Sequence, residues 1–189
     1  MNSKKSLIFI LPAVIALLGL SVFATTFQTQ EPLSQISDKS TVTGWVTLTV
    51  YDEFGNVKQK VENHNLIVDQ GLDEMAEAIF GAGGVGTTLF DYLEIGTDAT
   101  APSAGQTALV ASACARVQDA SPDVNSAISG ETHVSVISSF VGATCAGGIQ
   151  EAGIFNGLAG GQMLARSTFG VVTIASGDTL NVNYTITLT

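Results

Sequence analysis

The chain has 189 residues, 46% of them hydrophobic, and a formal net charge of −10 at pH 7. A chain of this length supports one core of ordinary size and hardly a second. Its seven lysines and arginines stand against seventeen acidic residues and form no basic stripe, which argues against nucleic acid as a partner.

Residues 1–24 have the layout of an export signal. Two lysines precede an apolar run that starts at Leu7, and Val22-Phe23-Ala24 supplies small residues where a signal peptidase would cut. Two alternatives stay open. One is a retained anchor helix, because residues 7–27 approach the roughly 20 residues that span a bilayer. The other is a pilin-type leader, although Ser6 stands where glycine or alanine is usual.

In each case we expect the rest of the chain to be extracellular or displayed on the cell surface. It would touch a membrane only through residues 7–27, if the leader is retained. Apart from Lys4 and Lys5, the chain has five basic residues against seventeen acidic ones, a net charge of −12 that favours solubility. Residues 25–40 are polar, and we interpret them as a tether to one folded domain over residues 41–189.

Alternation of apolar and polar residues predicts the first hairpin of this domain. Valine and leucine alternate with threonine and aromatic residues over 42–51, which is the period of a half-buried strand. The sequence DEFGN then supplies turn residues, with Gly55 and Asn56 tolerant of positive φ, and Val57 begins the return strand.

A short amphipathic helix is predicted over about residues 70–80. Five apolar residues recur there at helical spacing, namely Leu72, Met75, Ala76, Ile79 and Phe80. We expect this stripe to face the core, Asp69 to cap the helix and Gly81 to end it.

The remaining chain reads as short strands separated by turns rich in glycine, serine and aspartate. Strands are expected over residues 89–96, 133–141, 149–156, 162–174 and 179–189. The fold class is therefore mainly β, a β-sandwich-like domain that carries one helix.

Cys114 and Cys145 are the two cysteines of the chain. An even number in an exported protein favours a disulfide, which would stabilise the fold by roughly 3–4 kcal/mol. A metal site is the alternative, but two distant histidines offer it few further ligands.

Motifs of catalysis and cofactor binding are weak in this sequence. Residues 81–86, GAGGVG, match the glycine pattern of a dinucleotide loop but follow a predicted helix instead of opening one. His64 and His133 lie far apart on predicted strands. We expect no catalytic residues and no cofactor. Calcium is a minor candidate at Asp52, Glu53 and Asn56 or at Asp98, where turn chemistry explains the same residues.

Glu151 and Arg166 lie on opposite arms of a predicted hairpin around NGLAGG. They face each other if the turn centres on Leu158 and Ala159, and a charge among apolar neighbours needs such a partner. Arg116 is the competing partner for Glu151. We interpret Glu151 and Arg166 as a structural ion pair.

Several blocks in a fixed order resemble a group of phage tail-fibre and tail-appendage proteins. The blocks are NHNLIVDQGLDEMAEAIFG, YLEIGTDATAPSAGQTAL, a lone Arg116, EAGIFN, GGQMLARSTFG and SGDTLNVNYTITL. They span about residues 63–189. The resemblance implies a β-rich structural domain in an appendage that contacts cell surfaces, without enzymatic activity. Tail proteins of phages lack an export signal, which favours a cellular surface protein built on the same domain.

These observations predict an exported, non-enzymatic structural protein that self-associates, with residues 25–40 adding as a strand to a neighbouring sheet. The alternative is a monomeric module that binds glycan or another surface ligand through Trp45 and Tyr51, although burial beneath the helix is the ordinary expectation for them. Asn183 begins a glycosylation sequon within a predicted strand.

Overall fold

The computed structural model describes residues 41–81, 89–125 and 130–189. The expected leader, the tether and most of the GAGGVG segment lie outside these ranges.

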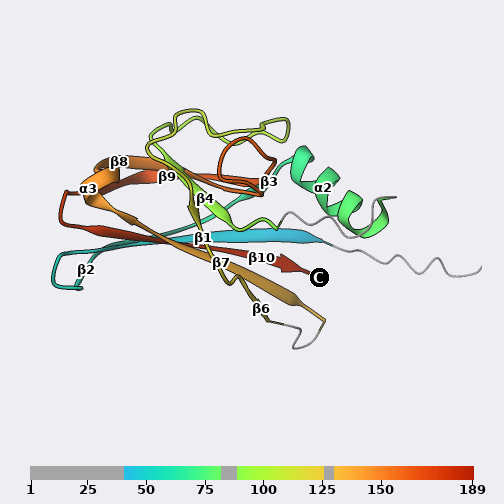
Figure 1. The fold of residues 1–189 in the computed structure, drawn as a ribbon, viewed down its shortest axis with the longest axis horizontal. Helices are drawn as coiled ribbons and strands as arrows, with labels where there is room; N and C mark the ends of the chain where they lie inside the picture. The colour runs from blue at the N-terminus through green and yellow to red at the C-terminus, as the bar shows by residue number, and fades with distance from the viewer. Residues whose placement is uncertain (1–40, 82–88, 126–129) are drawn as a thin grey trace, which may run out of the picture. The chain divides into compact units, whose positions relative to one another are not determined.

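Two five-stranded antiparallel sheets form the described domain (Figure 1). Sheet A has the order β2-β1-β10-β7-β6, and sheet B has the order β3-β9-β8-β4-β5. The strands of sheet A are β1 (Val42–Tyr51), β2 (Val57–His64), β6 (Asp123–Asn125), β7 (Thr132–Val141) and β10 (Thr179–Leu188). Those of sheet B are β3 (Leu66–Ile67), β4 (Tyr92–Gly96), β5 (Val117–Gln118), β8 (Gly147–Phe155) and β9 (Met163–Ile174).

The two central strands of sheet A show why the sequence folds in this way. Every second residue of β1 and β10 is buried, while the threonines and asparagines between them face outward. The two strands pair over their full length, from Val42 opposite Leu188 to Tyr51 opposite Thr179. A shift of one residue would exchange the buried and exposed faces, so the pattern sets the register.

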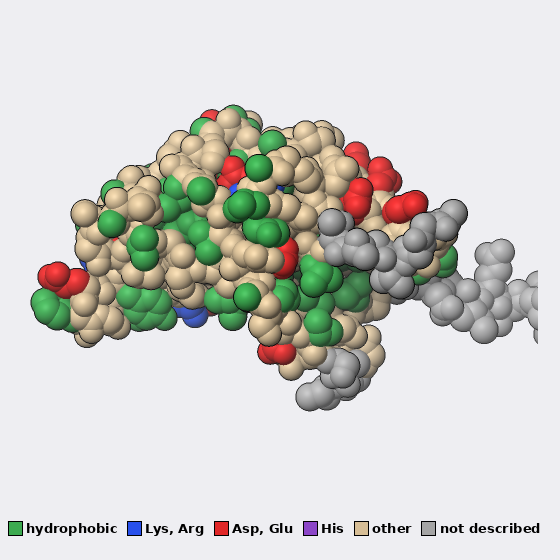
Figure 2. All heavy atoms as spheres, in the orientation of Figure 1, with side chains coloured by type: hydrophobic (Ala, Val, Ile, Leu, Met, Phe, Trp, Pro, Cys, Tyr) green, Lys and Arg blue, Asp and Glu red, His purple; other side chains and the backbone are tan. Residues whose placement is uncertain are grey.

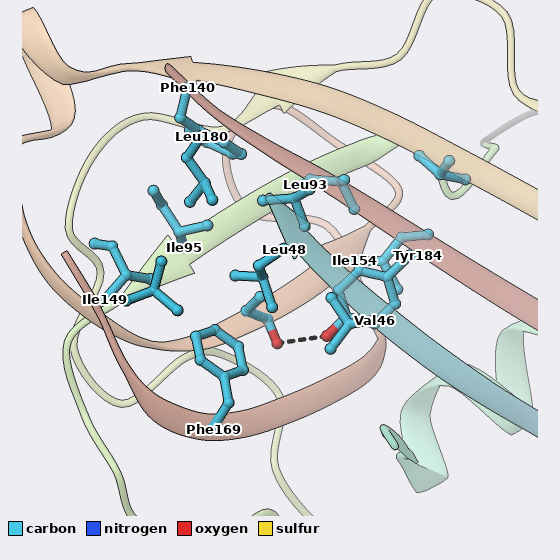
Figure 3. Packing of buried hydrophobic residues seen from close by; sticks show 14 of the residues in the cluster. Val46, Leu48, Leu93, Ile95, Phe140, Ile149, Ile154, Phe169, Leu180 and Tyr184 are labelled. Atoms are coloured by element: carbon cyan, nitrogen blue, oxygen red, sulfur yellow. Dashed lines mark hydrogen bonds between the residues drawn. The ribbon is translucent and has the colours of Figure 1, made fainter. Parts of the chain in front are cut away.

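The sheets pack face to face around one apolar core (Figure 3). Val46 and Leu48 of sheet A meet Leu93, Ile95 and other fully buried side chains of sheet B. The Tyr184 hydroxyl crosses this core and donates a 2.6 Å hydrogen bond to the carbonyl oxygen of Ala152. Burial raises the pKa of Tyr184, so the hydroxyl remains a donor at all ordinary pH values.

The helices differ from the sequence-based expectation. α2 (Asp69–Phe80) lies where it was predicted, but Val68 is its N-cap and no side chain caps it, so the cap predicted at Asp69 is wrong. The predicted buried stripe is also wrong, because Leu72, Ile79 and Phe80 are 45%, 68% and 85% exposed.

Close approach at one end of α2 explains this exposure. The helix meets sheet B through Gly71, where a Cβ atom would lie 2.6 Å from the Cα of Leu164. The later turns extend beyond the sheet, and Met75 alone of the predicted stripe packs against the main core.

A few short elements were not predicted. α3 (Gly142–Cys145) joins β7 to β8, and β3, β5 and β6 contain two or three residues each. Alternation cannot be recognised over so few residues. No helix within the described ranges is long and apolar enough to cross a membrane.

Candidate functional site

Glu151 of β8 and Arg166 of β9 form an ion pair on the outer side of sheet B, and neither side chain is exposed to solvent. Arg166 Nε donates to Glu151 Oε2 at 2.8 Å. Arg166 Nη2 lies 2.8 Å from the same oxygen, but its geometry does not make a hydrogen bond. Asp98 Oδ1 is 3.9 Å from Nη2 and adds a second, weaker charge contact.

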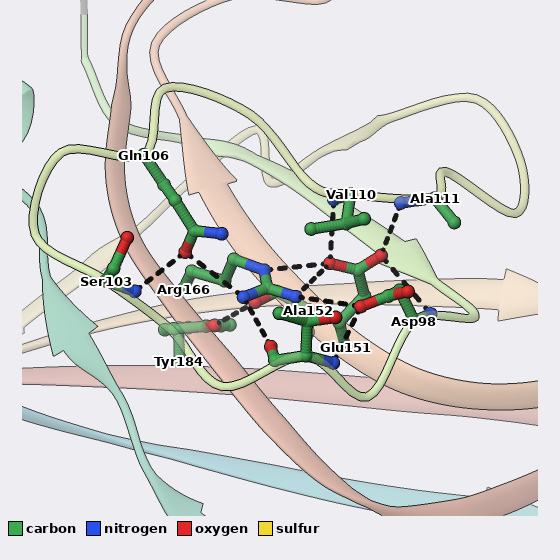
Figure 4. A network of polar contacts seen from close by, with 10 residues as sticks. Asp98, Ser103, Gln106, Val110, Ala111, Glu151, Ala152, Arg166 and Tyr184 are labelled. Atoms are coloured by element: carbon green, nitrogen blue, oxygen red, sulfur yellow. Dashed lines mark hydrogen bonds and ion pairs between the residues drawn. The ribbon is translucent and has the colours of Figure 1, made fainter.

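The segment of residues 97–111 wraps around this pair (Figure 4). Glu151 accepts hydrogen bonds from the backbone amides of Ala111 at 2.7 Å, Val110 at 3.0 Å and Asp98 at 3.4 Å. Arg166 donates through Nη1 to the Thr100 carbonyl and to Gln106 Oε1. The two charges therefore hold a long loop on the sheet. We call this arrangement the charge clamp.

The register of the hairpin corrects one expectation. Glu151 pairs with Thr168 and Arg166 pairs with Gly153, so the two charged residues do not face each other directly. Irregularities in the ladder beside Glu151 and Phe155 shift the pairing, and Gly160 and Gly161 turn the chain with φ values of 65° and 70°. The side chains meet diagonally, which long side chains can do.

Arg116, the competing partner, is used elsewhere. Its Nε donates to Glu94 at 2.7 Å, and Nη1 donates to the carbonyls of Gly157 and Gly160 in the β8–β9 turn. Its guanidinium carbon lies 3.5 Å from the ring centroid of Phe155. Planar stacking with several fixed acceptors is a role that arginine fills and lysine does not.

Replacement of Arg116 by lysine should therefore lower the free energy of unfolding by about 1–2 kcal/mol. The positive charge stays, but the several donors of the planar guanidinium and its stacking on Phe155 are lost. The measurement is urea unfolding followed by circular dichroism. The matched control is Lys60→Ala, since Lys60 and Glu62 form a pair in which both side chains are more than half exposed. Equal midpoints for R116K and K60A would contradict this role of Arg116.

Cys114 and Cys145 form a disulfide, with their Cα atoms 5.6 Å apart. Cys114 precedes β5 of sheet B, and Cys145 ends α3 at the corner between the sheets. The bond therefore fixes the edge of sheet B to the end of β7.

Asp52 and Asp98, two of the carboxylates considered for calcium, accept hydrogen bonds within the turns that contain them. Asp52 accepts hydrogen bonds from the amides of Phe54 and Asn56 and from the Asn56 side chain. Asp98 accepts one from the Thr100 amide at 2.6 Å. Hydrogen bonding to Asn56 and to Thr100, respectively, lowers the pKa of each carboxyl. Within the described residues, no group of three or more acidic, histidine or cysteine side chains is placed to hold a metal ion.

Asp178 closes the turn between β9 and β10. It accepts hydrogen bonds from Lys58 Nζ at 2.6 Å and from the Ala175 amide at 2.8 Å. The hydrogen bond from Lys58 is the main cause that lowers the pKa of Asp178. Nothing in the sequence marked this pair, because Lys58 of β2 and Asp178 of the β9–β10 turn lie far apart in the chain.

The lowered pKa of Asp178 predicts acid sensitivity. The folded state binds its proton less readily than the unfolded state, so this stabilisation is complete above the usual aspartate pKa of about 3.9 and is lost as the pH falls through the lower folded value. The difference in urea midpoint between pH 6 and pH 3 should be smaller in D178N than in the wild type. Parallel pH profiles of the two proteins would disprove this assignment.

Trp45 and Tyr51 both point away from the core on the open face of sheet A. Trp45 is 46% exposed and its ring lies 3.6 Å from that of His64, centroid to centroid, so the expected burial beneath the helix is wrong. Tyr51 is half-buried at the far end of the strand. Asn183 lies on the same face in β10, half-buried, with both neighbouring strands paired.

Within the described ranges, the outer side of β7 is unpaired beyond Ile137, at one of the two edges of sheet A. β6 pairs with β7 only from His133 to Ser135. Further along β7, the Asp119 carboxylate accepts a hydrogen bond of 2.7 Å from the Ile137 amide. Beyond Ile137, the described ladder pairs β7 with β10 alone. A groove of about 400 Å³ runs beside this edge, between residues 139–141 and residues 113–117.

A second cavity of about 310 Å³ lies between the sheets beneath α2. Its lining is apolar and includes Met75, Phe90, Val134 and Leu188. Hydrophobic side chains gather on the surface over β6, β7 and the end of β10 (Figure 2). This cavity lies at the opposite end of β7 from the groove, because Val134 precedes Ser139 along the strand.

Comparison with protein-family models, curated proteins and solved structures finds no match. The candidate site therefore rests on the geometry of the chain itself. The charge clamp, the Arg116 contacts and the disulfide fix loops to the sheets. Among the described strands, sheet A has unpaired backbone on the outer side of β2 and along β7 beyond Ile137, and the groove lies beside the β7 edge.

Proposed function

We propose that this chain is an exported, non-enzymatic structural protein of the cell surface or of an extracellular appendage. Its β-sandwich domain, tail-fibre-like in its sequence blocks, assembles with further copies by strand addition. The observation that carries the proposal is the open edge of β7 beside the groove. Open edges are sites at which a sheet accepts a strand from another chain.

Two further features support this role. The disulfide suits an oxidising compartment outside the cytoplasm. The charge clamp leaves neither Glu151 nor Arg166 accessible to a substrate, because both side chains are fully buried. These charged residues therefore serve the rigidity of the domain, as an assembly subunit requires.

The test is expression of the full chain with its own leader in a bacterial host, followed by fractionation of cells and medium. The proposed function predicts protein outside the cytoplasm, an oxidised disulfide, and particles larger than one chain in light scattering and negative-stain electron microscopy. Reduced protein that stays in the cytoplasm as a monomer would contradict it.

One observation favours the alternative, a displayed module that binds glycan. Trp45 is half-exposed, stacks on His64, and lies on a sheet face rich in threonine and asparagine. Aromatic rings on an open face can stack on sugar rings. A monomer whose binding to a glycan array is lost in Trp45→Ala, and kept in Thr43→Ala, would support this alternative over assembly.

A further inference from the structure

We infer that residues 25–31 of one copy add as a strand to the open edge of β7 in the next copy, with Phe27 entering the groove. The copies are thereby joined head to tail. This inference rests on the proposed function and names the partner, the acceptor edge and the polarity of the assembly.

The acceptor edge has its hydrogen-bonding groups directed outward. The Ile137 amide points away from β10, because it donates to the Asp119 side chain. Backbone groups in a strand alternate in direction, so the amides of Ser139 and Val141 point to the same side. Among the described residues no strand pairs with them there. An incoming strand would find these groups ready.

The groove gives that strand a place for an apolar side chain. Phe140 and Val141 line one wall, Ala113, Ala115 and Val117 line the other, and the disulfided cysteines close the end. The volume of about 400 Å³ is ample for one aromatic ring. Its lining holds one charged residue, Arg116, whose guanidinium is already bonded to Glu94.

The donor segment has the composition of a short strand. Residues 25–31 read TTFQTQE, with threonines around a single aromatic residue and neither glycine nor proline. Pro32 follows directly and ends the run. In such a strand Phe27 points to one face and Gln28 to the other, so one large apolar side chain enters the groove.

The polarity follows from the register of sheet A. Thr41, where the donor segment joins the domain, is hydrogen-bonded to Thr189 at one end of the sheet. The ladder places Thr132 at that same end and Val141 at the opposite end. The point where residues 25–40 join the domain and the acceptor edge therefore lie at opposite ends of the sheet, and repeated use of such a head-to-tail contact joins further copies into an open filament or a closed ring.

Reach also favours a second copy over the same copy. Residues 32–40 span at most about 30 Å when fully extended. Along the sheet, Thr132 and Ser139 are separated by about 24 Å, and two strands lie between β1 and the open side of β7, which brings the total path near 30 Å. The same copy could donate only with this linker nearly extended. A neighbouring copy docked end to end needs no such stretch.

Two pairs of matched variants in the full exported chain test the inference. Phe27→Asp removes the apolar anchor, while Gln28→Asp adds the same charge on the opposite strand face. Ser139→Pro removes an outward amide without touching the ladder to β10, and Ser139→Ala keeps that amide while losing the same side-chain contact with Asn181. We expect F27D and S139P to be single chains by light scattering, and Q28D and S139A to assemble as the wild type does.

Mixing the F27D and S139P variants gives a result that a misfolded variant cannot produce. F27D has an intact groove and S139P has an intact donor, so an equimolar mixture should form two-chain complexes and nothing larger. Assembly that persists in both F27D and S139P would overturn the inference and leave the proposed function standing. An exported wild type that is a monomer would overturn the inference and the self-assembling function together.

Discussion

Replacement of Arg166 by methionine is expected to lower the free energy of unfolding by about 3–5 kcal/mol, because Glu151 is left as a buried and uncompensated charge. Both side chains are completely buried, so water cannot take the place of the lost guanidinium. The measurement is urea unfolding followed by circular dichroism. It is best made in the F27D background, where we expect one chain per particle.

The double variant E151M/R166M separates the clamp from a simple ion pair. Removing both members of a buried pair is often nearly neutral. Here, however, the amides of Val110 and Ala111 lose their acceptor and the Thr100 carbonyl loses its donor. We therefore expect the double variant to stay destabilised, with protease cleavage within residues 97–111. A double variant as stable as the wild type would show that the pair does not hold this loop.

Removal of the disulfide is the second large effect. The double variant C114S/C145S opens a connection between cysteines 31 residues apart, which should cost about 3–4 kcal/mol in the chain-entropy account. Reduced wild type should unfold at the same urea concentration as the variant, which serves as the control. We also expect weaker assembly, because Cys114 and Cys145 both line the groove. Equal stability of the oxidised and reduced wild type would contradict this account.

The long strands could be predicted because their environment is regular. In β1 and β10 a buried face alternates with a half-buried or exposed one, so alternation predicts both their extent and their facing residues. The disulfide and the association of Glu151 with Arg166 were also within reach. Two cysteines allow one bond, and a glutamate within an apolar strand requires a nearby cation.

Other features depend on packing that the sequence does not record. The apolar stripe of α2 predicted a buried face, but the close contact at Gly71 leaves Ile79 and Phe80 exposed. The ladder irregularities in β8 and β9 displaced Arg166 from the position opposite Glu151. The ion pair of Arg116 with Glu94 could not be predicted, because nothing in the sequence distinguishes Glu94 from the other acidic residues as a partner. The edge of β7 is open because β6 has only three residues. No residue pattern in the sequence predicts that β6 is so short.

Amide hydrogen exchange at Ser139 and Val141 reports whether a neighbouring strand covers the edge of β7. The rates are compared between assembled wild type and the F27D variant, with Ser138, whose amide faces β10, as an internal reference. We predict that exchange at Ser139 and Val141 is slower in the assembled protein by at least about tenfold, while Ser138 is unchanged. Equal rates at Ser139 and Val141 in both proteins would mean that no neighbouring strand covers the edge of β7.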